Sequence, residues 1–304
     1  MRRYLLTAAV AVLGLAASHT PAFALRIAAP PQPAQMAIHS PVVVVGKVTA
    51  IEKDTVDATS PFVGAKDSVA YKVAVVKIDG ALAGADNLTH IKIGFVPPVA
   101  APNPNPPVGG VRPPIIRRGP QMPEIKEGQE LLLFLAKHPT GDFYVVPGMN
   151  YPVDVSTDAG KKTLEQVKRV TVVLADPAKG LKSEKAAERT DAAILAVMKY
   201  RSYPVLGGEA KDVAIPADES KLILKALAEA NWSLKNQGGA EFSPNAFVAF
   251  NQLGLADKDG WKPVIAQAKP GQPPVDYAAA TKEAFVKWLA GPGKDYQIKK
   301  VVAK

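Results

Sequence analysis

The pattern of hydrophobic and polar positions divides the chain into a strand-like half and a helix-like half. Between about residues 40 and 147, apolar side chains alternate with polar ones or form short β-branched runs, which favours strands. From about Ser156 onward, apolar residues recur at three- and four-residue spacing, which favours amphipathic helices. The change of period predicts a boundary between Pro152 and Thr157.

The strand-like half contains five expected strands. Gly46 interrupts the first strand and is expected to mark a bulge or a sharp bend. Glu130 to Lys137 is almost entirely apolar, which predicts a strand that is buried on both faces. The five strands are expected over Pro41 to Lys53, Ser68 to Asp79, Leu88 to Phe95, Glu130 to Lys137 and Phe143 to Val146.

The helix-like half contains five expected helices and a short final strand. Ser243 is expected to cap one helix with Pro244 at its first position, because serine is a favoured N-cap and proline fits that position. Asp276 is expected to cap the last helix, which Gly291 and Pro292 end. The helices are expected over Ala159 to Leu174, Ser183 to Tyr200, Asp218 to Trp232, Ser243 to Gly254 and Asp276 to Gly291, and the strand over Tyr296 to Val302.

The first 24 residues have the pattern of a secretory signal peptide. Arg2 and Arg3 precede an apolar run, and Ala22 and Ala24 place small residues at the two positions that a signal peptidase recognises. We expect cleavage after Ala24 and a periplasmic or extracellular protein. The apolar run is too short to span about 30 Å of hydrocarbon, so we expect no transmembrane segment in the mature chain.

Two proline-rich segments interrupt the pattern. Residues 25–38 are expected to form a flexible or extended lead-in. Residues 97–123 hold 10 prolines in 27 residues, together with Arg112, Arg117 and Arg118, and this composition is incompatible with a strand ladder or a helix. We expect an arm of polyproline-II character that recognises a protein groove or an anionic polymer. A tolerated insertion without a role is the alternative.

Composition narrows the classes of function. The chain has 304 residues and no cysteine, which excludes thiol nucleophiles, cysteine-ligated zinc, iron–sulfur clusters and c-type haem attachment. The net charge of +9 is spread over both halves in runs of at most two Lys or Arg residues. Such a surface is compatible with anionic envelope polymers, whereas a nucleic-acid partner is not expected without a concentrated basic patch.

No catalytic, cofactor or metal motif stands out, so we predict a protein without enzymatic activity or cofactor. His39, His90 and His138 could together bind zinc, but they lack helical or short-loop spacing, and solvent-facing or rim positions are expected instead. Trp232 and Trp261 lie beside loop-like segments and are candidates for stacking on a partner. Trp261 is expected in the core after a turn, and partial exposure of either tryptophan is the alternative under which it contacts a ligand.

Residues 38–150 resemble the OB-type barrel of the netrin-like modules, the group that includes the tissue inhibitors of metalloproteinases. The resemblance rests on Val43-Val44-Val45-Gly46-Lys47-Val48, on Tyr71 to Val75 followed by Ile78 to Gly84, and on the fourth-strand segment Glu127 to Leu135. It implies a small barrel of five strands. The inhibitors use an N-terminal cysteine that has no counterpart here, so the resemblance assigns no inhibitory residue.

We therefore predict an α+β protein with a five-stranded OB-like β-barrel in residues 39–152 and an α-helical domain in 153–304. The predicted function is that of an exported, non-enzymatic binding protein. Its expected partner is another exported protein or an anionic envelope polymer, with Arg112, Arg117, Arg118, Trp232 and Trp261 as candidate contacts. The alternatives are a netrin-like modulator or inhibitor of an exported protease and, less favoured, a hydrolase.

Overall fold

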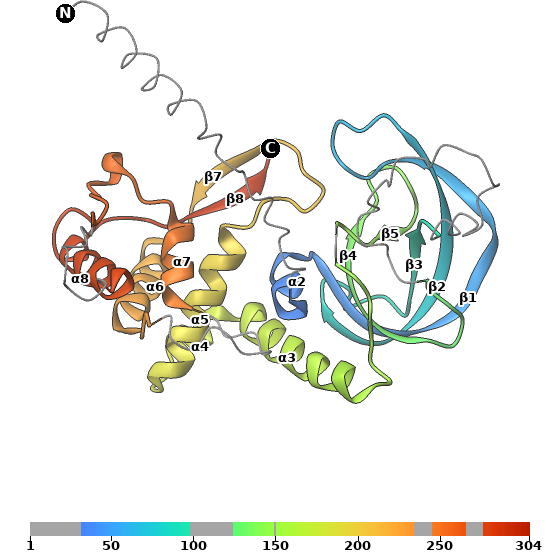
Figure 1. Cartoon of the computed structure of the whole chain (residues 1–304), viewed down its shortest axis with the longest axis horizontal. Helices are drawn as coiled ribbons and strands as arrows, with labels where there is room; N and C mark the ends of the chain where they lie inside the picture. Colours follow the sequence, from blue (N-terminus) through green and yellow to red (C-terminus); the bar gives the residue numbers. More distant parts are fainter. Residues whose placement is uncertain (1–31, 98–123, 149, 234–244, 266–275) are drawn as a thin grey trace, which may run out of the picture. The chain divides into compact units, whose positions relative to one another are not determined.

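The computed structural model describes residues 32–97, 124–148, 150–233, 245–265 and 276–304 (Figure 1). These residues form a mixed α+β structure with a six-stranded sheet, a two-stranded sheet and seven α-helices. The predicted α+β class is confirmed at this level. The predicted signal peptide and residues 98–123 of the predicted arm lie outside the described residues. No helix in the described part of the chain combines the length and the apolar character that crossing a membrane requires.

Five strands of the large sheet correspond to the five predicted strands, and a sixth strand was not predicted. The first two are longer than expected and form an extended, curved hairpin (Figure 1). The sixth strand has only two residues, too few to produce an alternating pattern. The strands are β1 (Val42–Thr59), β2 (Ser68–Ala83), β3 (His90–Phe95), β4 (Glu130–Lys137), β5 (Tyr144–Val145) and β6 (Val153–Asp154).

Five strands of the large sheet are paired in a closed ring that begins and ends at β1. The sheet has the order β1-β2-β3-β5-β4-β6, and β1 also pairs with β4. The β3–β5 pair is parallel, whereas the pairs β1–β2, β2–β3, β4–β5 and β1–β4 are antiparallel. Hydrogen-bonded neighbours therefore lead from β1 through β2, β3, β5 and β4 back to β1.

Gly46 marks an irregularity in β1, as the sequence predicts. The register between β1 and β2 shifts between Val45 and Gly46. A Cβ atom at Gly46 would lie 2.3 Å from the carbonyl oxygen of Lys77 and 2.7 Å from a methyl carbon of Val76. β2 therefore lies so close to β1 here that no side chain fits at this position.

β4 is buried on both faces, which confirms the prediction from its apolar run. Leu131, Leu133 and Leu135 belong to a cluster formed by strand residues. The alternate residues Leu132 and Phe134 belong to a second cluster that contains most of the buried helical side chains. Each face of β4 is thus covered by a different set of apolar residues.

The helices largely match the predicted segments, with one addition at the start of the chain. Residues 33–39 form a helix where an extended lead-in was expected. That expectation is wrong because Ala34, Met36 and Ile38 are buried in the helical cluster, and this burial stabilises a short helix that begins with Pro33. The helices are α2 (Pro33–His39), α3 (Asp158–Ala175), α4 (Pro177–Leu181), α5 (Ala186–Tyr200), α6 (Ala217–Glu229), α7 (Ala246–Leu253) and α8 (Tyr277–Leu289).

Two predicted helix starts differ from the structure, and a third is confirmed. α7 is capped by Asn245 instead of Ser243, because the Asn245 Oδ1 atom accepts hydrogen bonds from the next backbone amides, Phe247 at 2.8 Å and Val248 at 3.2 Å. The helix expected from Ser183 begins only at Ala186, since a separate short helix, α4, precedes it. Asp276 caps α8 as predicted, with Oδ1 3.0 Å from the amide nitrogen of Ala279.

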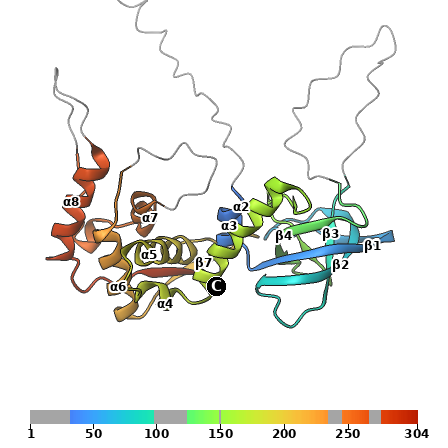
Figure 2. The same ribbon diagram turned by 90° about the horizontal axis from the view of Figure 1, so that it is seen from below.

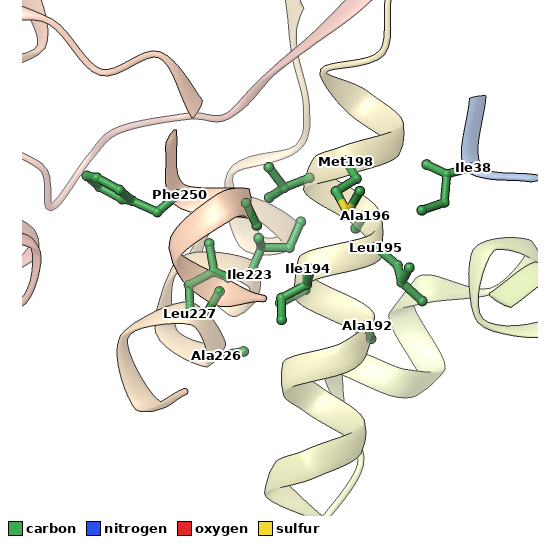
Figure 3. Close-up of a cluster of buried hydrophobic side chains, with 14 of the residues drawn as sticks. Ile38, Ala192, Ile194, Leu195, Ala196, Met198, Ile223, Ala226, Leu227 and Phe250 are labelled. Atoms are coloured by element: carbon green, nitrogen blue, oxygen red, sulfur yellow. The ribbon is translucent and has the colours of Figure 1, made fainter. Parts of the chain in front are cut away.

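α5 is the central helix of the helical cluster, and Ala192 to Met198 are all buried within it. Figures 2 and 3 show α5 among the other helices, with Ile223 and Leu227 of α6 on one side and Ile38 of α2 on the other. The predicted final strand is present as β8 (Lys299–Ala303). It pairs with an unpredicted strand, β7 (Ala210–Ala214), in the two-stranded sheet.

Candidate functional site

The predicted partner-binding tryptophans are buried. Trp232 is 2% exposed, and its indole nitrogen donates a 2.8 Å hydrogen bond to the carbonyl oxygen of Leu227. Its ring centroid lies 4.9 Å from that of Phe250 and 5.5 Å from that of Phe285. The expectation that this indole is partly exposed is wrong, because the neighbouring helices supply aromatic rings that enclose it.

Trp261 is also enclosed by aromatic rings and is 6% exposed. Its centroid lies 5.1 Å from that of Phe250 and 6.1 Å from that of Trp288, with interplanar angles of 66° and 89°. The expected core position of Trp261 after a turn is therefore confirmed, and the alternative of partial exposure is wrong. The arginines of the predicted arm, Arg112, Arg117 and Arg118, lie outside the described residues.

His138 is buried and hydrogen-bonded on both ring nitrogens. Its Nε2 donates to the carbonyl oxygen of Thr59 at 2.9 Å, and its Nδ1 accepts from the backbone amides of Thr140 at 3.2 Å and Gly141 at 2.8 Å. A rim position was expected, and that expectation is wrong because the ring connects the end of β1 to the turn after β4. His138 is thus a structural residue whose two nitrogens are already occupied.

The other two predicted histidines lie in different surroundings. His90 is exposed at the start of β3, as expected, and its Nδ1 lies 3.2 Å from the hydroxyl of Thr89. His39 is half-buried at the end of α2. Within the described ranges, no group of three or more histidine, aspartate or glutamate side chains is placed to hold a metal ion.

A cavity that sequence analysis did not identify lies between the sheet and the helices. We call it the Tyr203 cleft, and its volume is about 400 Å³. It is formed by the end of α2, the end of β4, the last turn of α5 with the segment that follows it, and β8. Its lining is mainly apolar and includes Pro41, Ala136, Tyr203, Leu206 and Val301, with His39 and Lys199 as polar members.

A second cavity, which we call the Leu82 cleft, has a volume of about 330 Å³. Its lining combines the end of β2 with α2 and α3, and includes Ala37, Leu82, Gly84, Asp86, Thr171 and Leu174. Lys199 lines this cavity as well as the Tyr203 cleft. One side chain of α5 is therefore shared by two cavities.

Lys199 has an unusual environment for a lysine. It is half-buried, and burial lowers the pKa of its ammonium group. Its closest polar contact is the carbonyl oxygen of Ser40, at the long distance of 3.5 Å from Nζ. No ion pair within the described part of the chain includes Lys199, whereas the lysine of β4, Lys137, is paired with Asp142 at 2.9 Å. The Lys199 charge is thus only weakly compensated.

His39 and Ser202 form a short hydrogen bond in the Tyr203 cleft, with 2.6 Å between Nδ1 and the hydroxyl oxygen. The Ser202 hydroxyl also lies 2.6 Å from the carbonyl oxygen of Met198, which can only accept. The single hydroxyl proton therefore points to Met198, and we assign the donor role in the other bond to His39 Nδ1. Burial, and secondarily the charge of Lys199, lowers the pKa of His39. In this arrangement His39 does not act as a base toward Ser202.

Exposed apolar side chains lie beside the Tyr203 cleft. Tyr203 is 70% exposed, and Val63, in the β1–β2 loop, is 68% exposed. The Val63 amide donates a 2.9 Å hydrogen bond to the carbonyl oxygen of Leu206, which lines the cleft. Phe62, next to Val63, is also exposed. The loop and the segment after α5 together present an apolar rim.

Part of this site had a signal in the sequence. Lys199 is a charged residue that follows the apolar run Ala192 to Met198, and a cation at the end of such a run marks a side chain near the edge of a core. Tyr203 had no such signal, because the residues that line the cleft with it include members of β4 and β8, which are distant in sequence. No protein-family model matches this chain, and no curated protein matches it either. Function is therefore inferred from the geometry described above.

Proposed function

We propose that this chain is an exported, non-enzymatic binding protein whose ligand site is the Tyr203 cleft. The observation that carries the proposal is an apolar cavity of about 400 Å³ with exposed apolar side chains at its rim. Exposed apolar groups beside a concave, mainly apolar surface are typical of binding sites. The partner is an exported protein or an anionic envelope polymer.

The strand region is proposed to be an OB-like barrel of the netrin-like type. The circuit of pairings from β1 through β2, β3, β5 and β4 back to β1 supports this fold, as does the parallel β3–β5 pair. OB folds bind ligands on one side of the barrel with the help of the loop between the first two strands. In this chain that loop contains Phe62 and Val63, beside the Tyr203 cleft.

A binding role fits the polar groups of the cleft better than hydrolysis does. The Ser202 proton is directed to the carbonyl oxygen of Met198, and His39 donates to Ser202. A serine nucleophile needs the opposite arrangement, in which the hydroxyl donates to a neutral histidine. The signal peptide of residues 1–24 stays a prediction, and it supports export. The arm of residues 97–123 also stays a prediction, and its arginines would give a second contact with the same partner.

Co-sedimentation with a crude cell-envelope fraction tests the proposal. The exported form, from Leu25, is expected to pellet with the envelope, and Tyr203→Ala is expected to weaken pelleting several-fold because it removes apolar area at the rim. Val172→Ala is the matched control, since Val172 is highly exposed on α3 and lines neither cleft. Equal pelleting of all three proteins, or no pelleting of the unaltered chain, would contradict the proposal.

Salt separates the two partner classes in the same experiment. Pelleting that disappears at high ionic strength indicates an anionic polymer held by lysine side chains, because salt screens exposed charges. Pelleting that persists indicates a packed protein interface at the apolar rim. In both cases Tyr203→Ala must pellet less than the unaltered chain if the cleft is the binding site.

A further inference from the structure

Lys199 provides a charge that the protein itself leaves almost uncompensated. Lys199 is half-buried and lines two cavities, and the one hydrogen bond of its ammonium group to a described residue goes to the Ser40 carbonyl oxygen at 3.5 Å. Removing a cation from water is costly unless a counter-charge or several hydrogen bonds replace the lost hydration. Among the described residues neither replacement is present, which favours an external anion.

The surroundings of Lys199 restrict the charge of that anion. On the Leu82 side the lining includes the carboxylate of Asp86, which disfavours a second anion there. On the Tyr203 side the other lysine, Lys137, already pairs with Asp142. His39 adds no second positive charge for the anion, because burial and the Lys199 charge lower its pKa and so favour its neutral form. One available positive charge matches a singly charged group better than a phosphate dianion, which is usually bound by several donors.

The remainder of the cavity restricts what the anion is attached to. Pro41, Ala136, Leu206 and Val301 give the Tyr203 cleft a mainly apolar lining, and Tyr203 offers an exposed aromatic ring at its edge. An apolar group of moderate size gains free energy by leaving water for such a surface. A ligand with an apolar body and one charged end therefore satisfies both parts of the cavity.

We propose that the Tyr203 cleft binds a carboxylic acid with an apolar body, whose carboxylate pairs with Lys199. This inference rests on the proposed function, because it names the chemistry of a ligand for the same cleft. A fatty acid and the free C-terminus of a peptide share this chemistry. Octanoate represents the first source, and N-acetyl-phenylalanine the second.

Calorimetric titration of the exported form with matched pairs of probes tests the inference. Each carboxylate is compared with its uncharged amide, octanamide or N-acetyl-phenylalaninamide. We expect at least one carboxylate to bind about tenfold more tightly than its amide, as a charge-assisted hydrogen bond implies. The better of the two acids then identifies the source.

Two variants assign the charge. Lys199→Met keeps a long apolar side chain and is expected to remove the preference for the carboxylate while leaving weak binding of the amide. Lys225→Met is the control, because Lys225 lies on α6, is exposed and lines neither cleft. If Lys199→Met does not fold, the comparison of acid and amide in the unaltered chain still decides.

The outcomes separate this inference from the proposed function. Equal binding of acid and amide, or an acid preference that persists in Lys199→Met, overturns the role of Lys199. Failure of both acids to bind overturns the carboxylate inference as a whole. The proposed function is decided independently by the effect of Tyr203→Ala on pelleting with the envelope fraction.

Discussion

His90, at the start of β3, and His138, directly after β4, show how the same residue type takes different roles in one sheet. His90 is exposed at the start of β3, whereas the His138 ring packs against the rings of Tyr71 and Phe143, with centroids 5.6 Å and 4.7 Å away. Two backbone amides and one carbonyl group depend on the His138 nitrogens. The structural importance of His138 therefore comes from three backbone hydrogen bonds that join the end of β1 to the turn after β4.

His138→Ala is expected to lower the free energy of unfolding by about 2–4 kcal/mol. The substitution leaves a cavity beside the Tyr71 and Phe143 rings and removes the partner of three backbone hydrogen bonds. His90→Ala is the control and is expected to change stability by less than about 0.5 kcal/mol, as is usual for exposed positions. Urea unfolding of the three proteins measures both values. Equal effects of the two substitutions would show that the His138 hydrogen bonds are not stabilising.

His39 is expected to make stability depend on pH between neutral and mildly acidic conditions. Its pKa in the folded protein is lowered from the ordinary value of 6.5, first by burial and then by the charge of Lys199. The unfolded chain therefore binds more protons once the pH falls to about 6.5 and below, so stability is lost as the pH decreases through that value. Above that range His39 is neutral in both states and has no such effect.

The variant His39→Asn isolates this contribution, because asparagine keeps a donor for Ser202 but does not titrate. Urea unfolding at about pH 7.5, 6.5 and 5.5 is expected to show a smaller loss of stability for the variant than for the unaltered chain. The carboxylates whose pKa is lowered, such as Asp154 and Glu188, are common to both proteins. Parallel pH curves for the two proteins would contradict the assignment to His39.

At the scale of a single element, the close approach of β1 and β2 depends on Gly46, which has no side chain. Gly46→Ala is expected to destabilise the protein by about 1–3 kcal/mol, because the added methyl group meets the Lys77 carbonyl oxygen at 2.3 Å and forces the strands apart. Gly80→Ala, in β2, is the control, since no atom lies within 4 Å of its added Cβ. The control is expected to be neutral or slightly stabilising. Thermal unfolding of both variants measures the difference.

Elements with their own local signals could be predicted from sequence, and elements that depend on distant partners could not. The apolar run of β4, the Asp276 cap of α8 and the Gly46 irregularity are each encoded within a few residues. Helix α2 is too short to be stable alone, and only its burial among other helices makes it favourable. β6 and β7 are short strands whose existence depends on β4 and β8.

The candidate site illustrates the same limit. Trp232 and Trp261 have loop-like neighbours in sequence, but the rings that bury them come from α7 and α8. The Tyr203 cleft combines α2, β4, α5 and β8, and only folding brings these elements together, because its lining residues His39 and Val301 are 262 positions apart in the sequence. Pattern analysis finds faces of single elements, whereas a cavity is a property of several elements together.

For the whole molecule, the strand and helical regions share one hydrophobic cluster. Val43 of β1 and Leu132 and Phe134 of β4 are buried in the cluster that contains α5 and α6. The division into two domains at 152/153 stays a prediction. The shared cluster determines how stable a fragment that ends at residue 152 would be. Separation would expose these three side chains on one face of the sheet.

A fragment of residues 25–152 is therefore expected to be much less stable than the full exported form. Burial of side chains the size of leucine and phenylalanine contributes about 1.5–3 kcal/mol each, and the fragment loses that contribution at several positions. We expect the fragment to bind a hydrophobic dye and to unfold at lower urea concentration, and the full exported form to unfold in a single transition. A fragment that is as stable as the intact chain would show two independent domains.

The two-sided burial of β4 also bears on how the chain avoids mispairing. Sliding a strand by one position normally exchanges its apolar and polar faces, but here both faces are apolar, so polarity along most of β4 gives no protection against slippage. The protection lies at the ends, where Glu130 and Lys137 are exposed and bracket the six buried residues. A slip in either direction would move one of these charged side chains into a buried position, which is costly. Two surface residues therefore fix the register of a strand whose buried part they do not belong to.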